Sequence, residues 1–172
     1  MAGAAHLTRR FFGSLRPGGP RAHDVAWVES VLSPAELDLW RRLYGPDRRH
    51  SVAVARRVQD ELGDQATNAV LAAALLHDVG KLQSGLRTYT RVAATLSAAV
   101  AGRETAELWV DSSGVTRRIG LYLKHPEIGS DMLAMADSDP LTVAWAREHH
   151  WPRDQWTIEL AVADVLWAAD DD

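Results

Sequence analysis

Residues 64–81, DQATNAVLAAALLHDVGK, decide the fold class of this 172-residue chain. The segment opens on Asp64, a residue type that caps helices, and becomes steadily more apolar along its length. It then ends in the polar pair His77-Asp78, followed by glycine and lysine. We therefore predict a buried helix that begins after Asp64 and places His77 and Asp78 at its C-terminal end.

The sequence on either side of this segment is also typical of helices, with few strand signals. Ser33-Pro34-Ala35-Glu36 forms a capping box with proline in the first turn, and Gly45-Pro46 stops that helix. Asp47 is expected to cap the next one, which Gly63 ends. We predict helices over residues 34–43, 47–62, 89–101, 115–123, 127–136, 140–150 and 154–168, and a short strand at 108–110. The predicted class is an all-α, single-domain helical bundle.

The domain organisation follows from composition. Residues 1–23 are expected to form a basic, proline- and glycine-containing N-terminal tail, and residues 24–172 one helical domain, the part of the chain that contains the candidate metal ligands discussed below. A chain of this length buries roughly 70% of its unfolded surface, which is enough for one core. An alternative for the tail is a short amphipathic anchor around residues 7–15.

Composition also restricts the class of function. The chain has no cysteine, so a disulfide framework and a thiolate zinc site are excluded, and a metal must bind His, Asp, Glu or water. Its 19 basic and 23 acidic residues give a net charge of -4, so no specific nucleic-acid binding is expected. The longest apolar run, residues 69–76, is too short for a transmembrane segment, and a cytoplasmic location is expected.

The last predicted helix carries a carboxylate on an apolar face. By i±3 and i±4 spacing, Asp164 shares its face with Leu160, Ala161, Trp167 and Ala168. Burial of an unpaired carboxylate costs several kcal/mol, so a buried Asp164 needs a cation, an arginine or a metal as its partner. We expect the carboxylate to be buried and partnered.

Histidines recur at similar positions. His50 aligns with Val54 and Val58 on one predicted helix, and His77 follows an apolar run directly. Taken singly, a histidine on an apolar face is more often a satisfied core residue than a ligand. Their joint pattern with the late aspartate is what indicates a shared site.

That joint pattern resembles the HD superfamily of metal-dependent phosphohydrolases over residues 47–169. The segments that carry the resemblance are His50, LLHDVGK at 75–81, HPEIG at 125–129, His149-His150 and Asp164. The motifs are most similar to the branch that contains the HD-GYP cyclic-dinucleotide phosphodiesterases. Two departures from that branch are Trp151 in place of the glutamate of its HHE motif, and PRDQW at 152–156 where it has Gly-Tyr-Pro.

The resemblance implies an all-helical bundle with a site for two divalent first-row metal ions, Fe or Mn first, with Ni, Co or Mg as alternatives. It implies a first metal held by His50, His77, Asp78 and Asp164, with Asp78 bridging to a second metal held by His125 and one or both of His149 and His150. It further implies hydrolysis of a nucleotide, cyclic dinucleotide or other small phosphate ester through a metal-activated water. Asp78 and Lys81 are the catalytic candidates, and Lys81, Arg49 and Trp151 are candidate substrate contacts.

Other classes of function fit the same residues. A non-catalytic HD module could sense a nucleotide or mediate protein interactions, with or without metal. A third possible class is a helical scaffold protein whose histidines are purely structural. Tightly bound metal together with turnover distinguishes the enzyme from both.

Overall fold

The computed structural model describes residues 18–86 and 108–171, and every regular element within them is helical. The predicted all-α fold is therefore confirmed. The α-helices are α2 (Ala22–Val31), α3 (Pro34–Arg42), α4 (Gly45–Leu62), α5 (Asn68–Leu76), α6 (Lys81–Ser84), α9 (Gly114–Leu123), α10 (His125–Met135), α11 (Pro140–Glu148) and α12 (Leu160–Asp171). Short 3-10 turns lie at η1 (Gly63–Gln65), η2 (Leu108–Asp111) and η3 (Arg153–Gln155).

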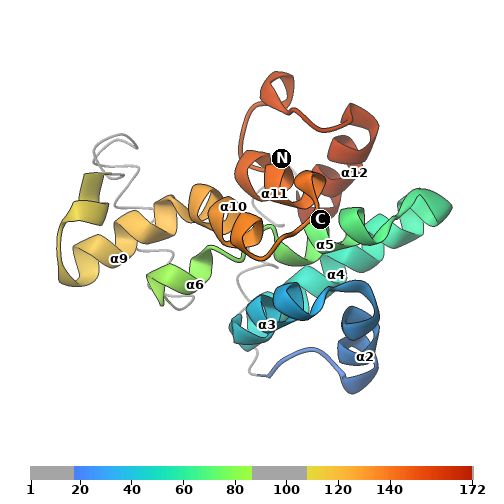
Figure 1. Cartoon of the computed structure of the whole chain (residues 1–172), viewed down its shortest axis with the longest axis horizontal. Helices are drawn as coiled ribbons and strands as arrows, with labels where there is room; N and C mark the ends of the chain where they lie inside the picture. Colours follow the sequence, from blue (N-terminus) through green and yellow to red (C-terminus); the bar gives the residue numbers. More distant parts are fainter. Residues whose placement is uncertain (1–17, 87–107, 172) are drawn as a thin grey trace, which may run out of the picture.

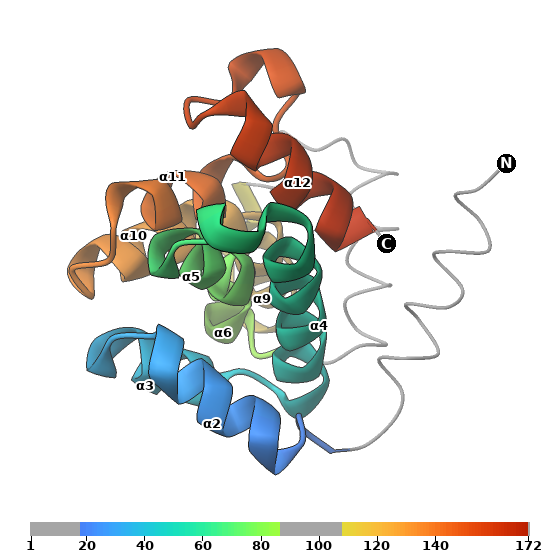
Figure 2. The ribbon, with the colours of Figure 1, turned by 90° about the vertical axis from the view of Figure 1, so that its right-hand side faces the viewer.

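Helix α5 lies at the centre of the fold. Every residue at positions 70–76 is buried, so this helix is apolar on all sides and has neighbours on all sides. Helices α4 and α11 pack closely against it, and α12 crosses both α4 and α5 (Figures 1 and 2). The core helix thus carries His77 and Asp78 to the point where these surrounding helices meet.

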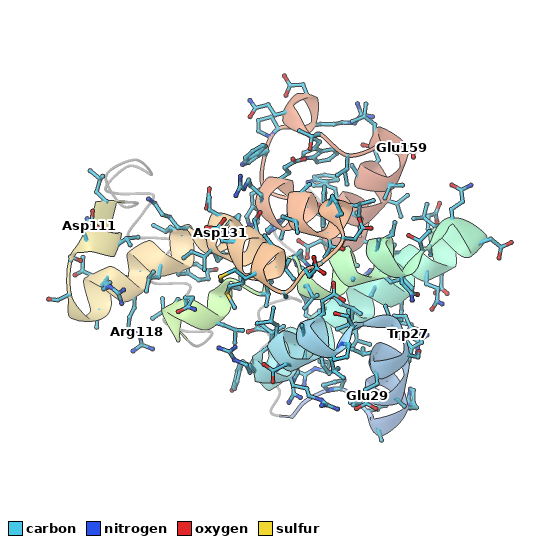
Figure 3. All side chains as sticks on the ribbon, in the orientation of Figure 1. Trp27, Glu29, Asp111, Arg118, Asp131 and Glu159 are labelled. Atoms are coloured by element: carbon cyan, nitrogen blue, oxygen red, sulfur yellow. The ribbon has the colours of Figure 1, made fainter. Side chains whose placement is uncertain are left out.

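Helices α2 and α3 cover one side of this core. Ser33 and Glu36 form the predicted capping box at the start of α3, and Trp40 on the same helix is fully buried. The Trp40 indole N–H donates to the Ser51 hydroxyl of α4 at 3.0 Å. On α2, Trp27 is labelled in Figure 3. The centroid of its ring lies 3.6 Å from Cζ of the Arg56 guanidinium. These contacts fasten the N-terminal helices to α4.

A separate arm is formed by α6, α9 and η2, which extend to the left of the core in Figure 1. Arg118 of α9 donates to the Ser84 carbonyl at 2.9 Å and also to the Gly85 carbonyl. The arginine therefore ties α9 to the end of α6. Figure 3 shows Arg118 and Asp111 on this arm, away from α12.

Five predicted helices were wrong at their starting residue. Two of them, α9 and α10, begin at Gly114 and His125 rather than at 115 and 127. Thr67, not Asp64, caps the core helix, because residues 63–65 form a 3-10 turn and the Thr67 hydroxyl accepts from the Val70 N–H at 3.4 Å. Helix α4 begins at Gly45 rather than at Asp47, since proline is accommodated in a first helical turn. Helix α12 begins at Leu160 rather than at 154.

The predicted strand at 108–110 was also wrong, because these residues form the 3-10 turn η2. An isolated strand of this length would need a partner strand, and none is found among the described residues. Instead, the backbone of Val110 packs directly on Gly120 of α9, where a Cβ would lie 2.5 Å from the Val110 nitrogen. The turn is therefore an element of helix packing.

Two sequence predictions concern parts of the chain outside the described residues. The expected helix at 89–101 lies wholly outside them, as do residues 1–17 of the expected tail. Helix α2 already begins at Ala22, two residues before the expected domain start. Among the described residues, no helix is both long and apolar enough to cross a bilayer.

Candidate metal centre

The histidines that sequence analysis singled out lie at the ends of helices around the core. His77 follows the last residue of α5, His149 follows the last residue of α11, and His125 opens α10. His50 lies within α4. Because these helix ends converge, side chains from distant parts of the sequence lie within one cluster.

One hydrogen-bond pattern fixes the orientation of three of these rings. In each, Nδ1 bonds the backbone carbonyl three residues earlier: His77 to Ala74 at 2.9 Å, His125 to Tyr122 at 2.6 Å and His149 to Ala146 at 3.0 Å. A carbonyl oxygen only accepts, so Nδ1 must carry the proton. The lone pair of each neutral ring is therefore on Nε2, as in histidines that bind metals through that atom.

The three Nε2 atoms are buried and have no hydrogen-bond partner. They face the carboxylate of Asp78: His77 at 3.5 Å, His125 at 3.2 Å and His149 at 3.8 Å. Buried polar atoms in folded proteins nearly always have a partner, and each exception needs an explanation. Here three exceptions converge on one carboxylate, and such an arrangement could hold a cation.

The two oxygens of Asp78 face different parts of the cluster. Oδ2 lies towards His77 and contacts the Lys81 ammonium, whereas Oδ1 lies towards His125 and His149. A carboxylate so placed is able to bridge two cations. Asp78 therefore lies between the two halves of the cluster.

The donors fall into two groups. His50, His77 and Asp78 form one, and His125, His149 and His150 form the other, with the donor atoms of each group within 4.8 Å of one another. The sequence neighbours His149 and His150 both belong to the second group, and their ring centroids are 4.1 Å apart. Each group offers three ligand atoms, which is enough to hold a metal ion.

Asp164 was predicted to be buried in this cluster, and that prediction was wrong. Its side chain is 45% exposed and forms a two-point ion pair with Arg153, at 2.6 and 2.7 Å. The face of α12 that it shares with Leu160 and Trp167 is the solvent face, on which those two side chains are 44% and 49% exposed. The expected arginine partner is present, but on the surface.

Asp170 occupies the place that was expected for Asp164. One of its carboxylate oxygens lies 2.8 Å from His50 Nε2 and 3.6 Å from His77 Nε2. It follows Ala163 and Leu166 on the buried face of α12 at spacings of seven and four residues. That spacing makes Asp170 a candidate in the sequence, although the stripe that contains Asp164 is equally regular.

Arg57 is a further residue that sequence analysis did not identify in this role. It lies two turns after His50 on α4, and its Nε and Nη2 both donate to the Ala169 carbonyl, at 3.0 and 2.6 Å. This forked contact fixes the last turn of α12 against α4. Asp170, the next residue, is thereby held beside His50.

The charges in the cluster shift the pKa values of its members in opposite directions. Burial lowers the pKa of His77, but Asp78 and Asp170 outweigh it and raise this pKa to about 9. Burial raises the pKa of Asp78, yet Lys81 and then His77 hold it well below its ordinary value. In the metal-free protein the two carboxylates are thus balanced by the Lys81 ammonium and the protonated His77, and His77 has to release its proton before it can bind a metal.

The second group of histidines is neutral at physiological pH. Burial lowers the pKa of His125, and burial followed by the charge of His150 lowers that of His149 well below its ordinary value. Part of His150 reaches solvent, but desolvation of its ring and then the charge of His125 lower its pKa to about 4. Neutral imidazoles retain the lone pairs that a metal requires.

The three predicted substrate contacts have different surroundings. Lys81 lies beside Asp78, inside the site. Arg49 donates to the Gly18 carbonyl at 2.5 Å and so binds the segment that precedes α2. Trp151 lies in the loop after α11, where its carbonyl accepts from the Trp156 indole at 3.1 Å. Of the three, Lys81 is the one that contacts the candidate centre.

The buried carboxylate of Glu148 stiffens the loop that follows α11. Glu148 accepts from both the backbone N–H and the hydroxyl of Thr157, at 2.7 and 2.6 Å, and Trp156 packs edge-on against the buried Trp145. The residues directly after Glu148 are the histidine pair. Their backbone therefore leaves α11 in a fixed direction.

No family model, curated protein or solved structure matches this chain.

Proposed function

We propose that this protein is a metal-dependent phosphohydrolase of the HD type, which hydrolyses a small phosphate ester such as a nucleotide. The observation that carries the proposal is the convergence of three buried Nε2 atoms, none of which makes a well-formed hydrogen bond, on the Asp78 carboxylate. A buried polar group without a well-formed hydrogen bond costs about 1–3 kcal/mol, and a purely structural role for the histidines does not explain three such groups. A bound cation removes that cost.

The donors fit two divalent first-row metal ions. His50, His77 and Asp170 would hold one, His125, His149 and His150 the other, and Asp78 lies between the two groups. Mixed imidazole and carboxylate donors suit Fe or Mn, and Ni, Co or Mg are alternatives. When bound, such ions supply Lewis-acid activation of water and neutralise charge on a phosphoryl group.

The residues of the chain have separate tasks in this proposal. The backbone carbonyls that bond Nδ1 of the histidines keep each ring aimed inwards, so little reorganisation is needed on binding. Lys81 places an ammonium beside Asp78, where it can meet a phosphoryl oxygen as a compact charge. Arg57 keeps α12 in place.

Metal content tests the proposal directly. We expect about two first-row metals per chain by plasma mass spectrometry, either as purified or after reconstitution with Fe²⁺ or Mn²⁺. Asp78→Ala should lose both, because it removes the shared carboxylate. Asp164→Ala is the matched control, since that aspartate is bound to Arg153 on the surface and should leave the metal content unchanged. Equal metal content in all three proteins would refute the site.

Turnover separates the enzyme from a sensor. The metal-loaded protein should hydrolyse p-nitrophenyl phosphate or its bis ester, and hydrolysis should disappear in Asp78→Ala. Metal binding without turnover of any phosphate ester tested would favour the non-catalytic module that senses a nucleotide.

A further inference from the structure

The solvent face of α12 is mostly apolar. Leu160 and Trp167 are 44% and 49% exposed, and Ala161 and Ala168 are exposed as well. Asp164 lies between them and is the one polar residue of these five. Helix α12 lies on the outside of the fold, where it crosses α4 and α5 (Figure 2). None of the five residues belongs to the two groups of metal donors, so the candidate centre does not explain this face.

The apolar residues on this face are arranged as in a helix that packs along another helix. Single exposed apolar side chains are common and need no explanation, but a contiguous group of them marks a contact site. Here the pair Leu160-Ala161 recurs seven residues later as Trp167-Ala168. A repeat of seven residues is the one at which two helices stay in contact along their length. The face therefore suits a second helix.

The order of large and small side chains favours a second copy of α12 itself. In an antiparallel pair of helices centred on Asp164, each residue meets the one that lies equally far beyond the centre. Leu160 then faces Ala168 of the other copy, and Ala161 faces Trp167 of the other copy. Each large side chain thus meets an alanine. The same contacts form at both ends, as a two-fold interface requires.

The charges at the centre of the face are also self-complementary. Arg153 donates to both carboxylate oxygens of Asp164, at 2.6 and 2.7 Å, and the two side chains are 60% and 45% exposed. A two-fold axis at Asp164 would bring two such pairs together. Because arginine has five N–H donors, each guanidinium can keep its own aspartate and also bond that of the other copy. Two positive and two negative charges would then balance at the axis.

We propose that this chain forms a two-fold dimer through the solvent face of α12, with each Trp167 against Ala161 of the other copy. The two Arg153–Asp164 pairs lie at the axis. The dimer does not depend on metal binding, since the donor Asp170 lies towards the buried side of the same helix. Tryptophan and arginine are the residue types that contribute most to interfaces. A contact of about one helix is smaller than a standard interface, so the dimer should dissociate at micromolar concentrations.

The first experiment places a charge on the apolar part of the face. Sedimentation equilibrium of the full chain measures dimerisation from about 1 to 500 µM. Ala161→Glu should weaken the dimer at least about tenfold, because it sets a carboxylate against Trp167 of the other copy. Ala35→Glu is the matched control, since Ala35 is also exposed and is also the second residue of its helix, α3. An acidic residue suits the first turn of a helix, so both variants should fold, which circular dichroism checks.

The second experiment reverses the charges at the axis. Arg153→Glu would place four carboxylates there, and Asp164→Arg would place four guanidinium groups, so each variant alone should dimerise at least about tenfold more weakly than the wild type. Mixed in equal amounts, the two variants should form a heterodimer, because one copy then brings two negative charges and the other brings two positive charges. A folding defect within one chain would not be cured by mixing.

Three results would overturn the proposal. The first is a wild type that stays monomeric up to the highest concentration, which would leave this face to a different partner. The second is a dimer that Ala161→Glu weakens no more than Ala35→Glu does. The third is a failure of the two charge variants to associate when they are mixed.

Discussion

Gly80 is the position at which a single methyl group should do most damage to the candidate centre. Its backbone has φ -63° and ψ -18°, which any residue adopts, so conformational freedom is not what requires glycine here. What requires it is the start of α10, because a Cβ at Gly80 would lie 2.0 Å from the His125 carbonyl oxygen and 2.6 Å from the Gly129 nitrogen. Both atoms are backbone, which cannot rotate away.

The cost of Gly80→Ala can be worked from this contact. Overpacked methyl groups in rigid surroundings typically cost 1–3 kcal/mol, and here the neighbouring backbone has to move, so we expect a loss of about 3 kcal/mol. For a chain of this size, that lowers Tm by about 6–12 °C. Since the first atom met belongs to His125, the movement should also displace this donor and weaken metal binding.

Gly114→Ala is the matched control. Gly114 has φ +61° and no atom within 4 Å of an added Cβ, so its substitution costs only backbone strain, about 1 kcal/mol. Urea unfolding followed by tryptophan fluorescence gives both free energies, and plasma mass spectrometry gives the metal content. If Gly80→Ala were no less stable than Gly114→Ala and kept its metal, the role assigned to this close approach would be wrong.

Four further predictions concern the centre itself. Asp170→Asn should lower metal affinity at least about tenfold in a competition titration with a fluorescent chelator, whereas Asp164→Asn should not change it. Arg57→Lys keeps the positive charge but loses the forked contact with the Ala169 carbonyl of α12. It should therefore lower metal affinity about tenfold while the helix content measured by circular dichroism stays nearly unchanged. An unchanged metal affinity would exclude the positioning role of Arg57. His77 has a pKa of about 9 without metal and must be neutral to bind one, so calorimetry in two buffers should detect about one proton released per chain at pH 7.5, falling towards zero above pH 9. The same raised pKa stabilises the metal-free protein fully below pH 6.5, and this contribution should disappear as pH rises from 6.5 through 9, as urea unfolding across that range would show.

The helix ends were predictable from the sequence wherever a local side chain sets them. Ser33 forms its capping box, and Asp139 caps α11 by accepting from the Leu141 N–H at 2.9 Å. Such signals extend over three or four residues, and they needed no knowledge of the rest of the fold. Thr67 was missed because Asp64, also a good cap, precedes it by one turn.

The choice between Asp164 and Asp170 was beyond what periodicity could decide. Helix α12 is apolar on both faces, so a stripe with Leu160 and Trp167 and a stripe with Ala163 and Leu166 are equally regular. Trp167 made the first stripe look like the core, yet it is half exposed. What selects the buried face is the packing of α12 on α4, which appears only in three dimensions.

The contact between His50 and Asp170 joins residues 120 positions apart. A ribosome that adds about 5–20 residues per second needs roughly 6–24 s to make the intervening chain. During that time His50 and His77 already exist, but the carboxylate that completes their group does not. If the chain binds metal as proposed, an ion that arrives before α12 is made would meet an incomplete set of donors. The full metal content would then mark a chain whose synthesis and folding have both reached the last helix.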